Sequence, residues 1–428
     1  MPRETRLPSL RSGVSGHGLE LGAGGGTRTH TEYYPHGLLR PTRIPFRHPG
    51  TQDVLYLAGQ EVDKHYSNPL NRGSVFIIGF IFCMKKHTLK RAGKKQTIAL
   101  LYHYVPKSIT DKYFSHEHSI VDNQTDEIVH YMQRLFRRRG FRVQVIKVTP
   151  NDLSDLKRLK ADFVFNLVDS KAMEMQIARI LDRLKIPHSG SSFEAIQTSN
   201  NKLRTKRLFE KGTLPTPKYT VIGVGTRIRR GLVPGKFPVI VKPAYEHCSI
   251  GITNNSIATN YEHFKEIVRG LRASHHQTLL AEEFIPGKEL QVTILEMRNK
   301  TVALPIAEIA FRNKTKNKWN IYGFDEKWSK NTAVYKSCHF VSPPKQLNTD
   351  IDSQIKKDSI RAFYSLGLRD YARFDLRYNP KIHRWYFLEA NANAGFDPDP
   401  RDAMTASIRA HGMTLDDFVL QIVKNSIH

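Results

Sequence analysis

Apolar positions in the first half of the chain repeat in a strand–helix–strand order that begins near residue 94. The run KKQTIALLYHY is typical of a buried strand, and the stretch after Thr125 has apolar residues at helical spacing behind a capping side chain. Gly140 ends that helix. The expected elements are a strand at 94–104, a helix at 125–139, a strand at 141–148, a helix at 152–161 and a strand at 162–168. This order predicts an α/β fold with a Rossmann-like, doubly wound sheet.

The second half of the chain mixes the two periods in a different order. A proline-punctuated linker, LPTPKY, separates its helical start from a strand-rich continuation. We expect helices at 173–184, from 193, at 200–212, 260–273, 352–368 and 413–427, and strands at 238–243, 278–285, 289–299, 301–309 and within 371–391. A polar stretch without a clear period precedes Ser342, and no internal repeat is visible.

The first ~90 residues have another texture, because Gly, Arg, Thr, His and Pro crowd residues 22–50 and no period is sustained. Such a segment does not supply a packed core. Met84, followed by two lysines, stands just before the first strand pattern, so we interpret residues 1–83 as a mispredicted extension and Met84 as the natural start. A genuine disordered tail is the alternative.

Charge and cysteine content narrow the classes of protein. The 66 basic and 40 acidic side chains give a formal charge of +26, which raises nucleotides, nucleic acid and anionic membranes as partners. No nucleic-acid-binding signature accompanies that charge, so we do not expect the protein to bind nucleic acid. Cys83, Cys248 and Cys338 lack CxxC spacing, which argues against disulfides or zinc and favours a cytoplasmic protein. The most apolar run, 75–83, has about half of the ~20 residues that a membrane span needs.

The strongest chemical signal lies between Arg373 and Asn391, where RFDLR and FLEAN flank a turn at 379–383. In an antiparallel hairpin this brings Asp375 beside Glu389, and side chains two apart share a face. Two carboxylates and an amide oxygen suit Mg²⁺, while Arg373 on the same face suits a transferring phosphoryl group. A lone Asp–Glu pair would instead be typical of a solvated strand face.

Two further segments add to this signal. PVIVKP ends an apolar strand on Lys242 before the loop AYEHCSIG, and a lysine at such a position suits a phosphate, although a lysine reaching out from a strand end is the commoner case. In LLAEEFIPGKE, Glu282 and Glu289 flank a strand and turn, where an acid can accept from adenine or ribose. Alone, that acidic pattern is common on surfaces.

With these three segments in this order, residues 95–428 resemble the ATP-grasp superfamily, most closely the D-alanine:D-alanine ligases, as a divergent member. The resemblance implies a pre-ATP-grasp domain at 94–190 and an ATP-grasp domain at 191–428, after a low-order extension at 1–93. Within the second, it implies a connecting helix at 191–213, a nucleotide lid lobe at 214–288 and a metal-binding catalytic lobe at 289–428. It also implies antiparallel sheets with helices in both lobes, and a homodimer.

The resemblance also implies a role for each matched residue. Lys202 and Lys242 would contact ATP phosphates under a loop with Ser249 and Gly251, and two Mg²⁺ ions, with Mn²⁺ as the alternative, would be held near them. The implied sets are Glu282, Phe284 and Ile285 at adenine, Glu289 at ribose, Asp375, Glu389 and Asn391 at the metals, and Lys327 with Trp328, Arg373 and Gly395 at the reacting groups.

Three departures concern the amino-acid side. The family's glycine-rich acidic loop is replaced by VDSKAMEMQ, its double serine by HCSIG, and its serine after the metal asparagine is absent from ANAGFDPDPRDA. The ATP-binding residues match the family, and the amino-acid pocket departs from it. The resemblance therefore implies an ATP-dependent carboxylate–amine ligase that forms an acyl phosphate, D-alanine:D-alanine ligase-like and serving peptidoglycan synthesis. The alternatives are a ligase for another amino acid or peptide, and a non-catalytic ATP-binding protein.

Overall fold

The computed structural model describes residues 95–106, 108–109, 116–121, 126–312, 319–399 and 402–427. These residues belong to one compact unit, 85–428. The expected extension at 1–93 and the start at Met84 lie outside the described residues. Three sheets organise the described part of the chain.

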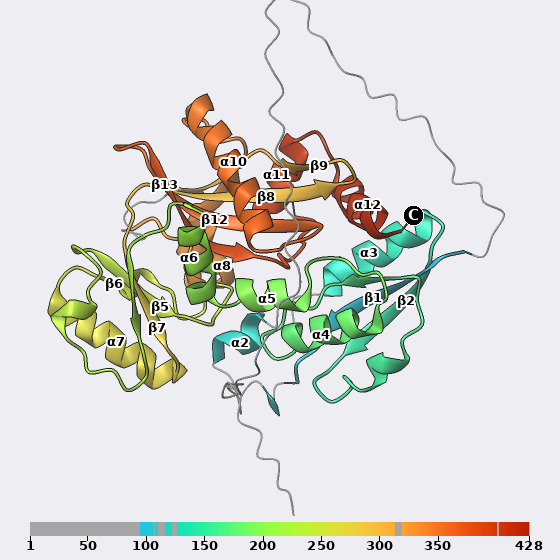
Figure 1. Cartoon of the computed structure of the whole chain (residues 1–428), viewed down its shortest axis with the longest axis horizontal. Coiled ribbons are helices and arrows are strands. Elements are labelled where there is room, and N and C mark those ends of the chain that lie inside the picture. Colours follow the sequence, from blue (N-terminus) through green and yellow to red (C-terminus); the bar gives the residue numbers. More distant parts are fainter. Residues whose placement is uncertain are drawn as a thin grey trace, which may run out of the picture. The chain divides into compact units, whose positions relative to one another are not determined.

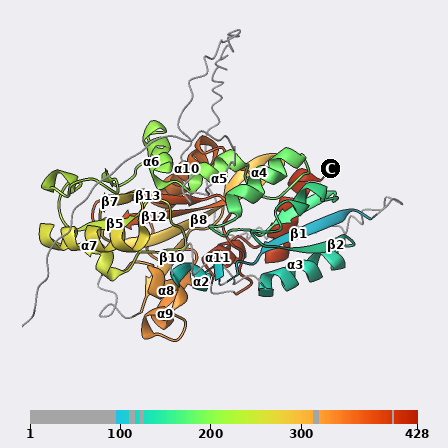
Figure 2. The same cartoon turned by 90° about the horizontal axis from the view of Figure 1, so that it is seen from below.

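The first sheet is parallel, as the alternating pattern predicts. β1 (Thr97–His103) lies between β2 (Arg142–Val148) and β3 (Phe163–Asn166). The apolar stripe of α3 (Asp126–Arg138) packs on one face and that of α4 (Glu174–Leu184) on the other (Figure 2). Alternate residues of β1 therefore enter two separate cores, which explains why its sequence is apolar throughout.

The helix expected at 152–161 is wrong. Only a short 3₁₀ turn, Asp155–Arg158, forms there, and Leu156 is the only residue of that turn that is buried. The hydroxyl of Thr149 donates to Asp152 at 2.7 Å, and this local side-chain bond fixes a turn where a helix would begin. Between β1 and α3, the described residues include the short helix α2 (His116–Val121).

The second sheet is antiparallel, with strand order β4-β7-β5-β6. Its strands are β4 (Tyr219–Ile222), β5 (Val239–Pro243), β6 (Ile257–Ala258) and β7 (Leu279–Glu283). α7 (Tyr261–His275) begins behind the Asn260 cap and lays Phe264 and Val268 on this sheet (Figure 1). α7 therefore covers one face of the sheet, and the other face carries the buried residues Lys242, Leu280 and Glu282.

The third sheet carries the predicted hairpin. Its order is β11-β10-β8-β12-β13, with β9 paired to β8. The strands are β8 (Lys288–Met297), β9 (Lys300–Ala303), β10 (Ala307–Phe311), β11 (Cys338–Val341), β12 (Tyr371–Asn379) and β13 (Arg384–Asn391). The helices α5 (Phe193–Ser199), α6 (Lys202–Lys211) and α10 (Thr349–Ser365) share a core with β8, β12 and β13, whereas α11 (Ala403–Ala410) and α12 (Leu415–Ser426) join the core that α3 and β1 also enter.

Two expectations about the last section need correction. The stretch before Ser342, expected to be irregular, forms α8 (Phe324–Trp328), α9 (Ala333–Ser337) and β11. Its elements are short, so no period is long enough to appear in the sequence. α11 was missed, although Asp402 caps it by accepting from the Thr405 amide at 3.0 Å. Among the residues that the structure describes, no helix is long and apolar enough to cross a membrane.

Candidate active site

The β12–β13 hairpin brings together the side chains expected to bind metal. Asp375 pairs with Glu389 across the strands, and Arg373 pairs with Asn391. The Arg373 guanidinium donates to both carboxylate oxygens of Asp375, at 2.8 and 3.1 Å. The amide nitrogen of Asn391 donates to the Arg373 carbonyl at 3.3 Å, which leaves its amide oxygen for another partner. The sequence argument for this face of the hairpin agrees with the register.

Burial and charge set the ionisation of these groups. Burial raises the pKa of Asp375, Glu389 adds to that rise, and Arg373 opposes it. Burial alone would lower the pKa of Arg373, but the ion pair with Asp375 raises it above its ordinary value. For Glu389 burial is outweighed, because Lys202 and Lys242 lower its pKa well below the usual range.

Lysines from two other elements meet this hairpin and its neighbouring sheet. Lys202, at the start of α6, lies with its Nζ 3.1 Å from Glu389 Oε2. Lys242, at the end of β5, lies 3.0 Å from Glu282 Oε2, and Lys206 lies 3.0 Å from Glu282 Oε1. These three lysines and Glu282 lie in the protein interior, because each is at most 5% exposed.

Glu282, expected at adenine, is ion-paired in the structure. Two lysines engage its carboxylate and, despite burial, lower its pKa. Lys206, which the sequence reasoning missed, has its pKa lowered to about 8 by burial. Its signal was available, because Lys202 and Lys206 are one helical turn apart on α6.

The expected nucleotide-loop residues are held by a second loop. Ser249 donates its hydroxyl proton to the Tyr322 carbonyl at 2.9 Å, and the Trp328 indole donates to the Cys248 carbonyl at 3.0 Å. Gly251 has φ +72°, and a Cβ there would meet Pro243 at 2.8 Å. A side chain at this position would therefore clash, which is the physical reason for glycine in the loop.

Glu289, Phe284 and Ile285 gather around an arginine that was not singled out. Arg377 Nη1 lies 3.2 Å from Glu289 Oε2, and its Nε donates to the Ile285 carbonyl at 3.0 Å. Phe284 and Ile285 are buried, and the Arg377 guanidinium lies 5.1 Å from the Phe284 ring centroid. Burial raises the pKa of Glu289 in spite of this pair. The signal for Arg377 was its place two residues after Asp375, on the same face of β12.

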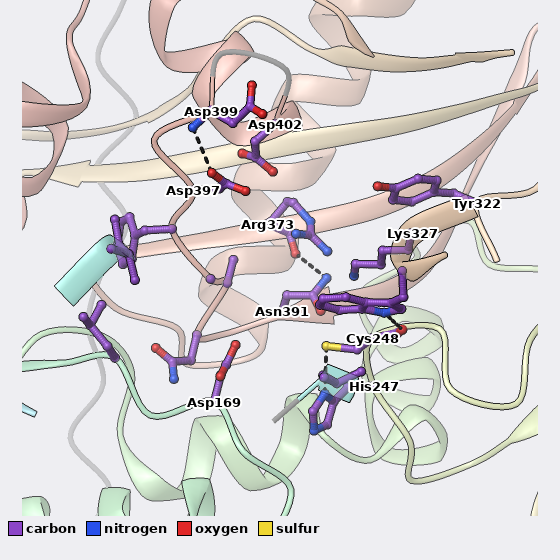
Figure 3. A pocket seen from close by; sticks show the side chains of 18 of the residues that line it. Asp169, His247, Cys248, Tyr322, Lys327, Arg373, Asn391, Asp397, Asp399 and Asp402 are labelled. Carbon is purple, nitrogen blue, oxygen red and sulfur yellow. Dashed lines mark hydrogen bonds between the residues drawn. The ribbon is translucent and has the colours of Figure 1, made fainter. Parts of the chain in front are cut away.

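A cavity of about 390 Å³ opens beside the hairpin. Six expected residues line it, and Figure 3 shows several of them facing the same space. They are Lys327, Trp328, Arg373, Glu389, Asn391 and Gly395. The other expected residues are not in its lining: Lys202, Lys242, Ser249, Gly251, Glu282, Phe284, Ile285, Glu289 and Asp375.

The lining of this cavity also holds acids that the sequence reasoning missed. They are Asp169, Glu174, Asp397 and Asp402. Burial raises the pKa of both Glu174 and Asp402. A polar residue just after a parallel strand is a sequence signal for Asp169, because ligands bind at the carboxyl ends of such strands. Glu174 is the first residue of α4, whereas Asp397 and Asp402 follow the metal-site asparagine in a stretch without a period.

The donor set at the hairpin fits a divalent cation only in part. The described residues contain no group of three or more His, Cys, Asp or Glu side chains that could hold a metal. Asp375 and Glu389 with the Asn391 oxygen supply hard oxygen donors on one face, which is what Mg²⁺ prefers when phosphate oxygens and water complete its shell. The residues thus fit a metal that arrives with a nucleotide.

Comparison with known proteins agrees with this geometry. The family model described as D-ala D-ala ligase C-terminus matches residues 227–424. The chain is 27% identical over 299 residues to the D-alanine–D-alanine ligase of Xylella fastidiosa, covering 68% of this chain and 91% of that protein. It is 32% identical over 253 residues to that of Methylacidiphilum infernorum, covering 59% and 74%.

Solved structures share the fold. A D-alanine–D-alanine ligase from Bacillus anthracis complexed with ATP aligns with a TM-score of 0.57 at 18% identity, covering 77% of this chain and 97% of that one. D-alanyl-alanine synthetase A from Vibrio cholerae aligns at 0.61 and 19% identity, covering 78% and 99%. The fold and the site define an ATP-dependent ligase with the ATP-grasp fold. Within that class, the chain belongs to the D-alanine–D-alanine ligase family.

Proposed function

We propose that this protein joins two amino acids of the D-alanine type by way of an acyl phosphate, as a step toward peptidoglycan precursors. The observation that carries the proposal is the hairpin face, where Arg373, Asp375, Glu389 and Asn391 lie together beside Lys202. Family membership supports the choice of substrate. A carboxylate, ATP and an amine are then the reactants.

Asp375, Glu389 and Asn391 would hold Mg²⁺, either two ions or Mn²⁺ in their place. When bound, the metal would neutralise charge on the transferring phosphoryl group. Lys202 and Lys242 enter from α6 and β5 to contact phosphate oxygens, and they are held in place by their present bonds to Glu389 and Glu282. Electrostatic positioning of this kind dominates phosphoryl transfer, so no acid or base is needed in the first step.

Adenine would lie between the two antiparallel sheets against Phe284 and Ile285, with Glu289 toward ribose. Ser249 and Gly251 would cover the phosphates, and the loop with Lys327 and Trp328 would close over the reacting centre. The bonds between these two loops support closure as a unit. Water has to be excluded because an acyl phosphate hydrolyses readily.

In the second step, the amine attacks the acyl carbon and inorganic phosphate leaves. Arg373 lines the cavity from the strand side, and Gly395 lines it from the loop after β13. The Arg373 guanidinium and the Gly395 amide would offset charge on the tetrahedral oxyanion. The raised pKa of Arg373 keeps it charged throughout.

A different amine is the second candidate. The cavity lining carries Asp169, Glu174, Asp397 and Asp402, and Asp397 and its neighbours lie where the family's serine is absent. Acids at that place disfavour a free carboxylate and favour an ammonium group. A basic or carboxylate-free acceptor would therefore keep the reaction type and change the product.

The test is phosphate release by the full-length protein with Mg²⁺ and ATP, followed by mass spectrometry of the products. D-alanine should stimulate release and yield D-alanyl-D-alanine. Stimulation only by other amino acids, peptides or amines would assign the second candidate, and no stimulation by any of them would favour a non-catalytic ATP-binding protein. We also propose a cytoplasmic homodimer, which native mass measurement and cell fractionation test.

A further inference from the structure

Asp169 occupies the place in the fold where parallel sheets bind ligands. It follows β3, whose neighbour β1 ends at His103, and the carboxyl ends of these two strands meet at one edge of the sheet. Asp169 Oδ1 lies 3.7 Å from His103 Nε2. The side chain of Asp169 is 40% exposed, whereas that of His103 is 1% exposed. The carboxylate thus has one side toward the cavity and one toward a buried imidazole.

Asp169 also reaches the reacting centre described above. A Cβ built on Gly395 would lie 3.4 Å from Asp169 Oδ2. The amide of Asn393 donates to the Val168 carbonyl at 2.7 Å, so the loop after β13 and the loop after β3 are tied to each other. In Figure 3, Asp169 points into the cavity from the side opposite Arg373.

Four other acids near this site are already engaged. Asp375 is bonded to Arg373 and Glu389 to Lys202. Asp402 caps α11, and Glu174 accepts from the Asn200 amide. Asp169 accepts no hydrogen bond from any described residue, and its single ion-pair contact in the described part of the chain is His103. It is therefore an acceptor that faces the cavity without a donor.

The reaction needs such an acceptor. An amino acid enters as an ammonium ion, whose nitrogen has no lone pair, so a proton must leave before the nitrogen attacks. Arg373 and Lys327 in the cavity are hydrogen-bond donors rather than acceptors. A positioned carboxylate on the opposite wall meets the geometric requirement for general-base catalysis.

We propose that Asp169 is the general base that deprotonates the attacking ammonium, with His103 as a positioning residue behind it; this inference rests on the proposed function. The Asp169 carboxylate takes one proton from the ammonium nitrogen, and the neutral amine then forms the new N–C bond. The C–O bond to phosphate breaks with its electron pair on phosphate, and the departing phosphate takes the second proton from nitrogen, which leaves the neutral amide. Asp169 then returns its proton to solvent. His103 holds the carboxylate from a pocket where neither ring nitrogen has a hydrogen-bond partner among the described residues.

Hydroxylamine separates the two steps experimentally. It is largely uncharged at neutral pH, so it captures an acyl phosphate as a hydroxamate without a base. For the Asp169→Asn variant, we expect dipeptide formation to fall by about 10²-fold while hydroxamate formation stays within about two-fold of the wild type. The remaining dipeptide rate should rise with pH, following ionisation of the free amine.

Each other outcome has a separate meaning. Equal loss of dipeptide and hydroxamate in Asp169→Asn, or loss of neither, would overturn Asp169 as the base. A wild-type protein that forms no hydroxamate with any carboxylate would overturn the proposed function itself. The matched control is Asp126→Asn, which makes the same change at the exposed start of α3, outside the cavity lining. It should change neither rate by more than about two-fold.

The role of His103 has its own readout. In His103→Gln we expect kcat for the dipeptide to fall by about ten-fold with KM unchanged and hydroxamate retained. The double variant should be no slower than Asp169→Asn alone, because the two residues act as a unit. Additive losses, or a loss of hydroxamate as well, would indicate a structural role and overturn the pairing.

Discussion

The two walls of the active-site region differ in the groups that partner their acidic side chains. On the hairpin and nucleotide side, every named carboxylate has a cationic partner: Asp375 with Arg373, Glu389 with Lys202, Glu282 with two lysines and Glu289 with Arg377. On the rest of the cavity lining, the second wall, Glu174 and Asp402 accept from amide groups, and Asp169 faces the cavity. The first wall is prepared for phosphate and metal, and the second for an incoming ammonium.

The largest expected effect comes from removing a charge of the first wall. Asp375→Asn should lower the rate of phosphate release by about 10²–10³-fold, because a positioned charge near the transferring group is lost. Asp352→Asn is the control, since it makes the same change in a surface ion pair of α10. Equal rates in wild type and Asp375→Asn would mean that this wall is not the metal and phosphoryl site.

The buried lysine pair of the first wall should control stability. Lys206→Met should lower the free energy of unfolding by about 3–5 kcal/mol, because the buried carboxylate of Glu282 loses one of its two cationic partners. Urea unfolding measures it. Lys211→Met, at the exposed end of the same helix, should stay within about 0.5 kcal/mol. A loss of less than about 0.5 kcal/mol in Lys206→Met would contradict the buried ion pair between Lys206 and Glu282.

Asp370, the residue before Tyr371 of the cavity lining, is another acid that accepts from amide groups. It accepts from the Gly190 amide at 2.8 Å and from Asn425 at 3.3 Å, and burial raises its pKa to about 6. The folded protein therefore binds more protons than the unfolded chain between about pH 4 and 6. Across that range this group should lower the free energy of unfolding by about 3 kcal/mol as pH rises.

Asp370→Asn should remove that contribution. Urea unfolding of both proteins at acid and neutral pH gives the difference directly, because the other titrating groups cancel. No difference in pH dependence between the two proteins would show that Asp370 ionises in the folded state as it does in the unfolded chain.

The smallest effect concerns substrate charge at the second wall. Asp397 is exposed on the cavity lining, where its carboxylate repels a substrate carboxylate and attracts an ammonium group. In Asp397→Asn, the preference for D-alaninamide over D-alanine, measured as a ratio of kcat/KM, should fall about two- to five-fold. High salt should reduce the preference in the wild type in the same direction. An unchanged ratio in both experiments would place the acceptor away from this acid.

The sequence predicted one wall better than the other for a physical reason. The hairpin is local, so alternation along RFDLR and FLEAN fixes which side chains share a face, and the register agrees with that expectation. Asp397 and Asp402 lie in loops, where no period reports direction. The helix expected at 152–161 failed for a related reason, since a local bond from Thr149 to Asp152 competes with the helix.

By itself, the sequence determined the longer helices, the parallel and hairpin strands, and the candidate set on β12 and β13, because hydrophobic periodicity and turn residues act over a few positions. Tertiary structure alone decided which charges meet. It placed Lys206 and Lys242 on the two oxygens of Glu282, and it brought His103 behind Asp169 at the edge of the first sheet. Ion pairs between distant segments depend on how the sheets pack, and no local pattern encodes that packing.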